Sequence, residues 1–190
     1  MNALTTPYGL LSFPNLFTPR SPAENTEPRY SINLVFDEKA QKSPEYTAMQ
    51  KAVIACAKEA FGEKVDMKSL RTPFRDAGQK EYQGYNDGDM FISAWTKQKP
   101  GLVNAQRSEI LDPNDVWPGQ LARATIKPFS YDVSGNKGIS FSLNNVQIVK
   151  KDMPRLDGRK AAEDDFDEVE ETSSTDDESA GDNDSTDAFG

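Results

Sequence analysis

Two segments of the chain alternate apolar residues with rings and cations. In residues 89–99 and 121–131 one parity is apolar and suits the interior of a fold. The opposite parity carries Phe91, Trp95, Lys97 and Lys99 in the first segment and Arg123, Lys127, Phe129 and Tyr131 in the second. Rings can stack on bases while cations follow phosphates, so the pattern predicts a stacking platform for single-stranded nucleic acid. The alternative is that the rings pack under a loop and the cations only solubilise the surface.

The segment between residues 71 and 85 repeats this mixture. Its rings and arginines are Arg71, Phe74, Arg75, Tyr82 and Tyr85, and glycines are interspersed among them. A polar loop has little reason to bury its rings, which favours contact with nucleic acid. A packed connection that covers the end of the fold is the alternative.

Catalytic signals are sparse. The chain has no histidine and a single cysteine, so the common general base and the commonest metal ligand are missing. Asp87 and Asp89 could hold Mg²⁺, but the sequence Asn-Asp-Gly-Asp over residues 86–89 is also typical of a tight turn. We therefore expect no enzyme, no cofactor and no metal site.

One segment has the local signals of a helix that would brace these residues. Ser43 suits the N-cap, Pro44 the first helical position and Gly62 the end. The apolar residues that recur at helical spacing between them are Met49, Val53, Cys56 and Ala60. Cys56 is therefore expected in the core, and a lone cysteine fits a reducing compartment.

Most of the remaining chain has the alternation of strands. Strands are predicted over residues 29–37, 90–98, 102–110, 121–131 and 138–149. The pair Asn144-Asn145 shifts the apolar parity, as a bulge would. Five or more strands with one helix inserted after an early strand predict a mainly β fold, a small and highly curved barrel.

Charge divides the chain near residue 160. Residues 1–160 hold all 22 Lys and Arg with 18 acids, net +4, whereas residues 161–190 hold the other 13 acids and no base, net −13. The second part has almost no large apolar residue and is expected to be disordered. We predict one domain over 1–160 and an acidic tail over 161–190, in which Phe189 is a candidate partner-binding residue.

Three stretches carry a resemblance to a known family. They are residues 92–101, residues 115–120 (Asp-Val-Trp-Pro-Gly-Gln), and residues 129–132 (Phe-Ser-Tyr-Asp) followed by 135–147. Over roughly residues 8–157 the chain resembles the bacteriophage single-stranded DNA-binding proteins long catalogued as a domain of unknown function. Residues 153–158 depart from the Asp-Gly-Glu-x-Leu-Gly-Gly-like end of that family.

The resemblance implies an oligonucleotide/oligosaccharide-binding (OB) barrel of five strands. It implies a protein that coats single-stranded DNA without strong sequence preference during phage replication, recombination or repair, in the host bacterial cytoplasm. The candidate DNA-binding residues are Arg29, Arg71, Phe74, Arg75, Tyr82, Tyr85, Phe91, Trp95, Lys97, Lys99, Arg107, Arg123, Lys127, Phe129 and Tyr131. Related phage replication proteins also join such a barrel to an acidic tail with a terminal aromatic, which supports a role for Phe189 in binding replication or recombination proteins.

Two other functions stay open from the sequence. A metal-dependent phage nuclease would use Asp87 and Asp89. A DNA-free interaction protein would act through its acidic tail, for example as a decoy for a host nucleic-acid-binding protein. No apolar run approaches the roughly 18 residues that a membrane span needs, so no membrane partner is expected, and the sequence leaves a homo-oligomer open.

Overall fold

The computed structural model describes residues 3–150 and 153–158. The predicted disordered tail and Phe189 lie outside these residues. The elements along the chain are β1 (Leu4–Thr5), β2 (Gly9–Arg20), β3 (Arg29–Phe36), α1 (Glu38–Gln41), α2 (Pro44–Phe61), the short 3-10 helices η1 (Met67–Ser69) and η2 (Pro113–Asp115), β4 (Arg75–Asp76), β5 (Met90–Thr96), β6 (Gly101–Val103), β7 (Leu121–Val133) and β8 (Asn136–Lys150). No helix in the described part is long and apolar enough to cross a membrane.

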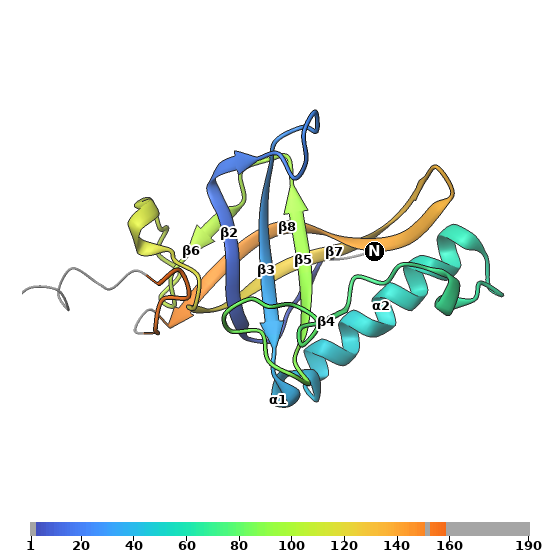
Figure 1. Cartoon of the computed structure of the whole chain (residues 1–190), viewed down its shortest axis with the longest axis horizontal. Helices are drawn as coiled ribbons and strands as arrows, with labels where there is room; N and C mark the ends of the chain where they lie inside the picture. The colour runs from blue at the N-terminus through green and yellow to red at the C-terminus, as the bar shows by residue number, and fades with distance from the viewer. Residues whose placement is uncertain (1–2, 151–152, 159–190) are drawn as a thin grey trace, which may run out of the picture. The chain divides into compact units, whose positions relative to one another are not determined.

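Five strands pair into a closed ring. The order is β7-β2-β3-β5-β8, and β8 pairs back with β7. The β5–β8 pair is parallel, with Ala94 opposite Phe141, and the other pairs of the ring are antiparallel. Figure 1 shows β2, β3 and β5 side by side, with β7 and β8 crossing behind them and extending beyond the ring as a long hairpin. The mainly β, OB-like prediction with one principal helix is confirmed.

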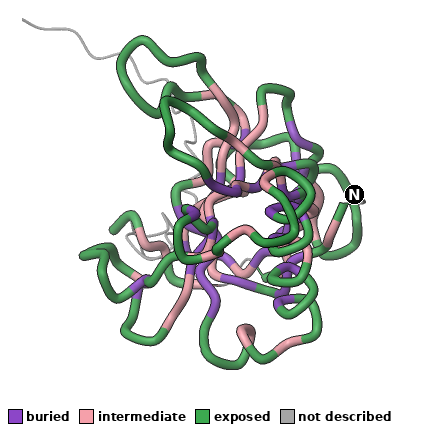
Figure 2. The backbone as a smooth tube through the Cα atoms, turned by 90° about the vertical axis from the view of Figure 1, so that its right-hand side faces the viewer, coloured by how far each residue is buried: buried purple, intermediate pink, exposed green. Residues whose placement is uncertain are grey.

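The interior of the ring is apolar. Alternate residues of each strand point inward, and Phe36, Phe141, Ile92 and Ile126 are each at most 1% exposed. Most buried positions lie on the strands and on α2, whereas the connecting loops are mostly exposed (Figure 2). Much of the outer face of the strands lies outside this core.

Helix α2 continues this core. The Ser43 hydroxyl accepts a hydrogen bond from the Tyr46 backbone N–H, Pro44 opens the helix and Gly62 ends it, as predicted. Met49, Val53 and Cys56 are buried in the same cluster as the ring interior, and burial raises the pKa of the Cys56 thiol. Ala60 is exposed and Ala57 is buried instead, so that one assignment was wrong.

Four of the five predicted strands are present as β3, β5, β7 and β8, and the two-residue strands β1 and β4 were not predicted. The predicted bulge is present, because Thr125 pairs with Asn145 while its neighbour Ile126 pairs with Leu143. The strand predicted over 102–110 is only the short β6, since residues 104–108 form a turn. Strand β2 was not predicted: its register shifts twice against β3, which breaks the simple alternation.

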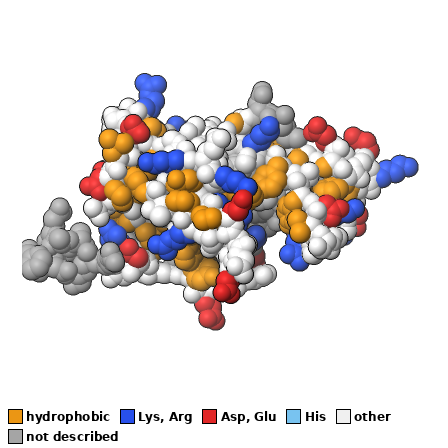
Figure 3. All heavy atoms as spheres, turned by 90° about the horizontal axis from the view of Figure 1, so that it is seen from above, with side chains coloured by type: hydrophobic (Ala, Val, Ile, Leu, Met, Phe, Trp, Pro, Cys, Tyr) orange, Lys and Arg blue, Asp and Glu red, His pale blue; other side chains and the backbone are white. Residues whose placement is uncertain are grey.

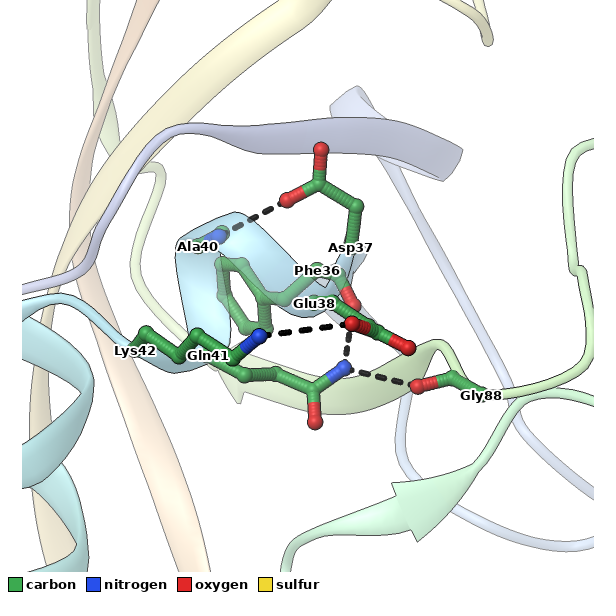
Figure 4. Close-up of polar contacts among 7 residues, drawn as sticks. All are labelled: Phe36, Asp37, Glu38, Ala40, Gln41, Lys42 and Gly88. Atoms are coloured by element: carbon green, nitrogen blue, oxygen red, sulfur yellow. Dashed lines mark hydrogen bonds and ion pairs between the residues drawn. The ribbon is translucent and has the colours of Figure 1, made fainter.

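Helix α1 holds the start of β5 in place. The Gln41 side-chain amide donates to the Phe36 carbonyl (3.0 Å) and to the Gly88 carbonyl (2.9 Å). Figure 4 shows this amide between the helix and the turn that precedes β5. The long connection from α2 to β5 is thereby fixed at its far end.

Candidate nucleic-acid interface

The outer face of β3 and β5 is floored by short polar side chains. Asn33 on β3 pairs with Ser93 on β5. The Ser93 hydroxyl donates to the Asn33 side-chain oxygen (2.7 Å), and the Asn33 amide nitrogen donates to the Tyr85 hydroxyl (3.0 Å). These bonds fix the orientation of the Asn33 and Ser93 side chains.

Two of the predicted rings meet beside this floor. Trp95 on β5 and Phe129 on β7 make an edge-to-face contact with centroids 5.6 Å apart. The contact spans β8, where Ser142 pairs with Trp95 and Ser140 with Phe129, and these small residues leave room for the rings. Both rings are half-buried, so each retains accessible surface.

A cation lies against the tryptophan. The Arg29 guanidinium is 4.5 Å from the centroid of the Trp95 ring. Partial desolvation lowers the pKa of Arg29, although the group stays cationic at neutral pH. The Trp95 ring and the Arg29 guanidinium therefore lie together on the outer face, as expected of a stacking platform.

A first cleft opens on one side of the floor. It has a volume of about 550 Å³ and lies between the connection preceding β5 and the β7–β8 hairpin. Its lining comprises Arg71, Thr72, Pro73, Arg75, Lys80, Ser93, Tyr131, Ile139 and Ser140. Three of these residues are cationic and none is acidic, so the cleft favours an anion.

A second cleft opens on the other side. It has a volume of about 530 Å³, and its lining comprises Phe13, Pro14, Asn15, Arg20, Ser21, Pro22, Arg29, Ser31, Val116, Pro118, Arg155 and Asp157. Asp157 accepts two hydrogen bonds from Arg155 (3.1 and 3.0 Å), so the positive charge of Arg155 neutralises the negative charge of this carboxylate.

The outer face of β3 and β5 connects the two clefts. Ser31 lines the second cleft and Ser93 the first, and they lie on the paired strands β3 and β5. We call this surface the groove: both clefts, the Asn33–Ser93 floor, Trp95 and Phe129. Seen from the side of the β2–β3 loop, Lys and Arg side chains are interspersed with hydrophobic ones (Figure 3).

Two predicted rings are buried and not exposed in the groove. Phe91 is 2% exposed and Tyr85 is 7% exposed, in a small cluster with Val35 and Ala77. The cause is β4, which pairs with β5 at Phe91 and brings its connection over the outer edge of that strand. The expectation that these rings are exposed for stacking was wrong.

Phe74 also turns inward. Its ring packs against Tyr46 of α2 (5.3 Å) and against Phe141 of the ring interior (5.9 Å). It braces the connection against the core and is partly buried. The packed-connection alternative therefore describes Phe74, Tyr85 and Phe91 better than the stacking hypothesis does.

Tyr82 does reach the surface, together with Phe13, a ring that was not predicted from the sequence. Tyr82 and Phe13 are 49% and 50% exposed, with centroids 5.0 Å apart. Phe13 has φ +46°, a strained conformation for a residue other than glycine, and it lies at a register shift of β2. The sequence Phe-Pro within an apolar run was the available signal.

The predicted cations divide into several groups. Arg29, Arg71 and Arg75 line the groove. Lys97 forms an ion pair with Glu27, which lowers the pKa of that carboxyl through a hydrogen bond and charge attraction, and Lys99 lies 5.8 Å from the Phe17 ring. Lys127 is exposed on β7. Arg107 and Arg123 line a different pocket. Arg20 and Arg155 of the second cleft were not predicted from the sequence.

Asp87 and Asp89 belong to a turn. The Asp89 backbone N–H donates to the Asn86 carbonyl (3.2 Å), and the Asn86 amide donates to the Asp89 carboxylate (3.0 Å). Within residues 3–150 and 153–158 no group of three His, Cys, Asp or Glu is arranged to hold a metal ion. Residues 86–89 therefore form the tight turn that was one of the two interpretations of their sequence.

Comparison with known proteins gives a consistent set of relatives. A family model described as Enterobacter phage Enc34, ssDNA-binding protein, matches residues 5–178. The chain is similar in structure to the single-stranded DNA-binding protein from bacteriophage Enc34 in complex with ssDNA (TM-score 0.67, 22% identity, 79% of this chain and 87% of that chain). It is also similar to gp2.5, a single-stranded DNA-binding protein encoded by bacteriophage T7 (TM-score 0.59, 14% identity, 85% and 98%). No curated protein sequence matches it.

Proposed function

The chain belongs to the Enc34 family of phage single-stranded DNA-binding proteins, and from this premise we propose that it binds single-stranded DNA along the groove. It does so without strong sequence preference. By covering transient single strands it protects them and removes their secondary structure during phage DNA replication, recombination or repair. It performs no covalent chemistry.

The observation that carries this proposal is the composition of the groove. Trp95 and Phe129 offer ring surface, Arg29 lies over Trp95, and the first cleft adds Arg71 and Arg75. Base–ring stacking contributes about 1–3 kcal/mol per base and tolerates any sequence, while the cations neutralise phosphates. Short side chains on the floor leave space for a strand to lie close to the sheet.

The same geometry explains how hairpins would be removed. In a duplex both faces of each base are stacked on neighbouring bases, so only an unpaired, unstacked base can offer a face to Trp95 and the groove favours the single strand. A ligand that binds one of two states shifts the equilibrium toward it, and melting follows from binding alone. No energy source is required.

The remaining roles are part of the proposal. The acidic tail, residues 161–190, competes with DNA for the groove and docks onto replication or recombination proteins through Phe189. In support, Asp157 lines the second cleft only a few residues before the tail begins in sequence. The proposed location is the host bacterial cytoplasm.

The test is fluorescence anisotropy of a labelled thymidine oligomer with the full-length protein over a salt series. Each phosphate contact contributes about 0.7 to the magnitude of the log–log salt slope for a single strand. Arg75→Ala, in the first cleft, should flatten the slope by about that amount, and so should Lys127→Ala, two residues from Phe129 on β7. Lys51→Ala, on the exposed side of α2, is the matched control and should leave the slope unchanged. Absence of binding by the wild-type protein would refute the proposal.

A further inference from the structure

A separate cationic pocket lies beside β1 and β6, along β7 and β8. Its volume is about 300 Å³, and we call it the rim pocket. The residues that matter here are Arg107, Arg123, Thr125, Asn145 and Gln147. The part of the chain that the structure describes contributes two arginines to its lining and no carboxylate.

Gln147 organises the rim pocket. Its side-chain oxygen accepts a hydrogen bond from Arg123 Nε (2.8 Å), and its amide nitrogen donates to the Asn104 carbonyl (3.0 Å) and the Ala105 carbonyl (3.3 Å). One side chain thus orients the Arg123 guanidinium through Nε and also holds the turn that carries Arg107. The terminal nitrogens of Arg123 are the atoms best suited to a phosphate.

The turn that presents Arg107 is itself fixed. The Asn104 side-chain oxygen accepts from the backbone N–H groups of Gln106 (3.0 Å) and Ser108 (2.9 Å). Arg107 has φ +67°, a conformation that costs a residue other than glycine or asparagine some stability. An exposed arginine is therefore held in a strained backbone conformation in the same pocket that Arg123 lines.

The outward side of β7 links this pocket to the groove. Tyr131 lines the first cleft, Lys127 is exposed, and Arg123 lines the rim pocket. These residues share one parity, opposite to the buried Ala122, Ala124 and Ile126. At about 3.3 Å per residue, Tyr131 and Arg123 are roughly 26 Å apart along the strand. Lys127 lies midway between them in sequence.

We infer that the rim pocket is a second phosphate-binding site, which holds the backbone of the same DNA strand after it leaves the first cleft along β7. This inference rests on the proposed function. Its consequence is that short oligonucleotides fill the groove alone, whereas longer ones also engage Arg107 and Arg123. The protein would then bind longer strands with a steeper salt dependence.

The experiment compares full-length wild type with the double variant Arg107→Asn/Arg123→Gln over thymidine oligomers of increasing length. Asparagine is chosen because it tolerates the positive φ of the turn. On the longest oligomers the double variant should show a salt slope smaller by about 1.4, two contacts at about 0.7 each. On the shortest oligomers that bind, its slope and affinity should equal those of wild type.

Two controls make the result specific. Lys51→Ala/Lys64→Ala removes the same charge from exposed positions elsewhere and should match wild type at every length. Arg107→Asn alone keeps the Arg123–Gln147 hydrogen bond and should lower the salt slope on long oligomers by about 0.7. This single variant replaces the double variant in the comparison if the double variant does not fold. Equal slopes for wild type and the arginine variants at all lengths would overturn the inference. Failure of wild type to bind any oligomer would instead overturn the proposed function.

Discussion

Short side chains shape the groove as much as its rings do. Ser140 and Ser142 on β8 are what allow Trp95 and Phe129 to meet across the strand between them. Larger residues at these positions would separate the two rings. The Asn33 amide, bonded to both Ser93 and Tyr85, leaves the floor polar and satisfied, so bases can stack beside it without burying an unpaired group.

At this scale the sharpest prediction concerns Trp95. Trp95→Ala should weaken binding to a thymidine oligomer by about 1–3 kcal/mol, because one ring–base stack is lost. The fold should survive, since the ring lies on the outer face and outside the buried core cluster. Anisotropy measures the affinity, and far-ultraviolet circular dichroism checks the fold.

The second tryptophan provides the control. Trp117 is not among the residues that line the two clefts; its ring nitrogen donates to the Met153 carbonyl (3.3 Å), and the Arg155 guanidinium lies 5.3 Å from the centroid of its ring. In a Trp117→Phe variant, DNA should quench the remaining fluorescence of Trp95 while affinity stays near that of wild type. Unchanged affinity in Trp95→Ala would remove this ring from the DNA path.

Among the elements, the connection from α2 to β5 is the one that decides which rings are exposed. It crosses the edge of β5 through β4, buries Phe91 and Tyr85, and leaves Tyr82 at the surface. Its far end depends on Gln41, whose amide bonds two backbone carbonyls (Figure 4). The connection is therefore a structural part of the groove wall.

Gln41→Leu should lower the free energy of unfolding by about 1–3 kcal/mol. Two hydrogen bonds are lost, each with a net contribution of about 0.5–1.5 kcal/mol. Urea denaturation followed by fluorescence measures the change. Lys42→Ala is the neighbouring control: it removes only an exposed ion pair with Glu38 and should cost no more than about 0.5 kcal/mol. Equal stability of Gln41→Leu and wild type would show that this anchor is dispensable.

Over the whole molecule the dominant feature is the separation of charge. Residues 1–160 are net +4 and residues 161–190 are net −13. The cations of the groove attract DNA, and the same field attracts any other polyanion. A tethered polyanion acts at high effective concentration, so competition from the tail is expected to depend strongly on salt.

Deletion of residues 161–190 should tighten binding to single strands at low salt, with a gain that shrinks as salt rises. Anisotropy of full-length and truncated protein across a salt series measures the effect. The truncated protein should also fail to pull down a phage or host replication protein. If the two proteins bind DNA equally at every salt concentration, the tail does not compete.

Phe189→Ala separates the two roles of the tail. One neutral ring contributes little to electrostatic competition, so DNA affinity should match that of the full-length protein. A ring can still anchor a pocket on a partner, so the pull-down should weaken. If Phe189→Ala bound DNA as tightly as the tail-deleted protein does at low salt, the ring would be needed for competition with DNA, and this assignment of roles would be wrong.

The sequence by itself determined the features that depend on neighbouring residues. The cap at Ser43, Pro44 and the alternation in β3, β5, β7 and β8 act over one turn of helix or a few residues of strand, so helix and strands could be located from them. The bulge at Asn144-Asn145 was predictable for the same reason. Parity also identified Trp95 and Phe129 as facing outward.

Only the tertiary structure decided which outward residues remain accessible and which of them lie together. Phe91 has the same parity as Trp95, yet β4 covers one and not the other. Arg123 has the same parity as Phe129, yet it lines the rim pocket and not the groove. Such outcomes depend on contacts between segments distant in sequence, and strand periodicity carries no information about them.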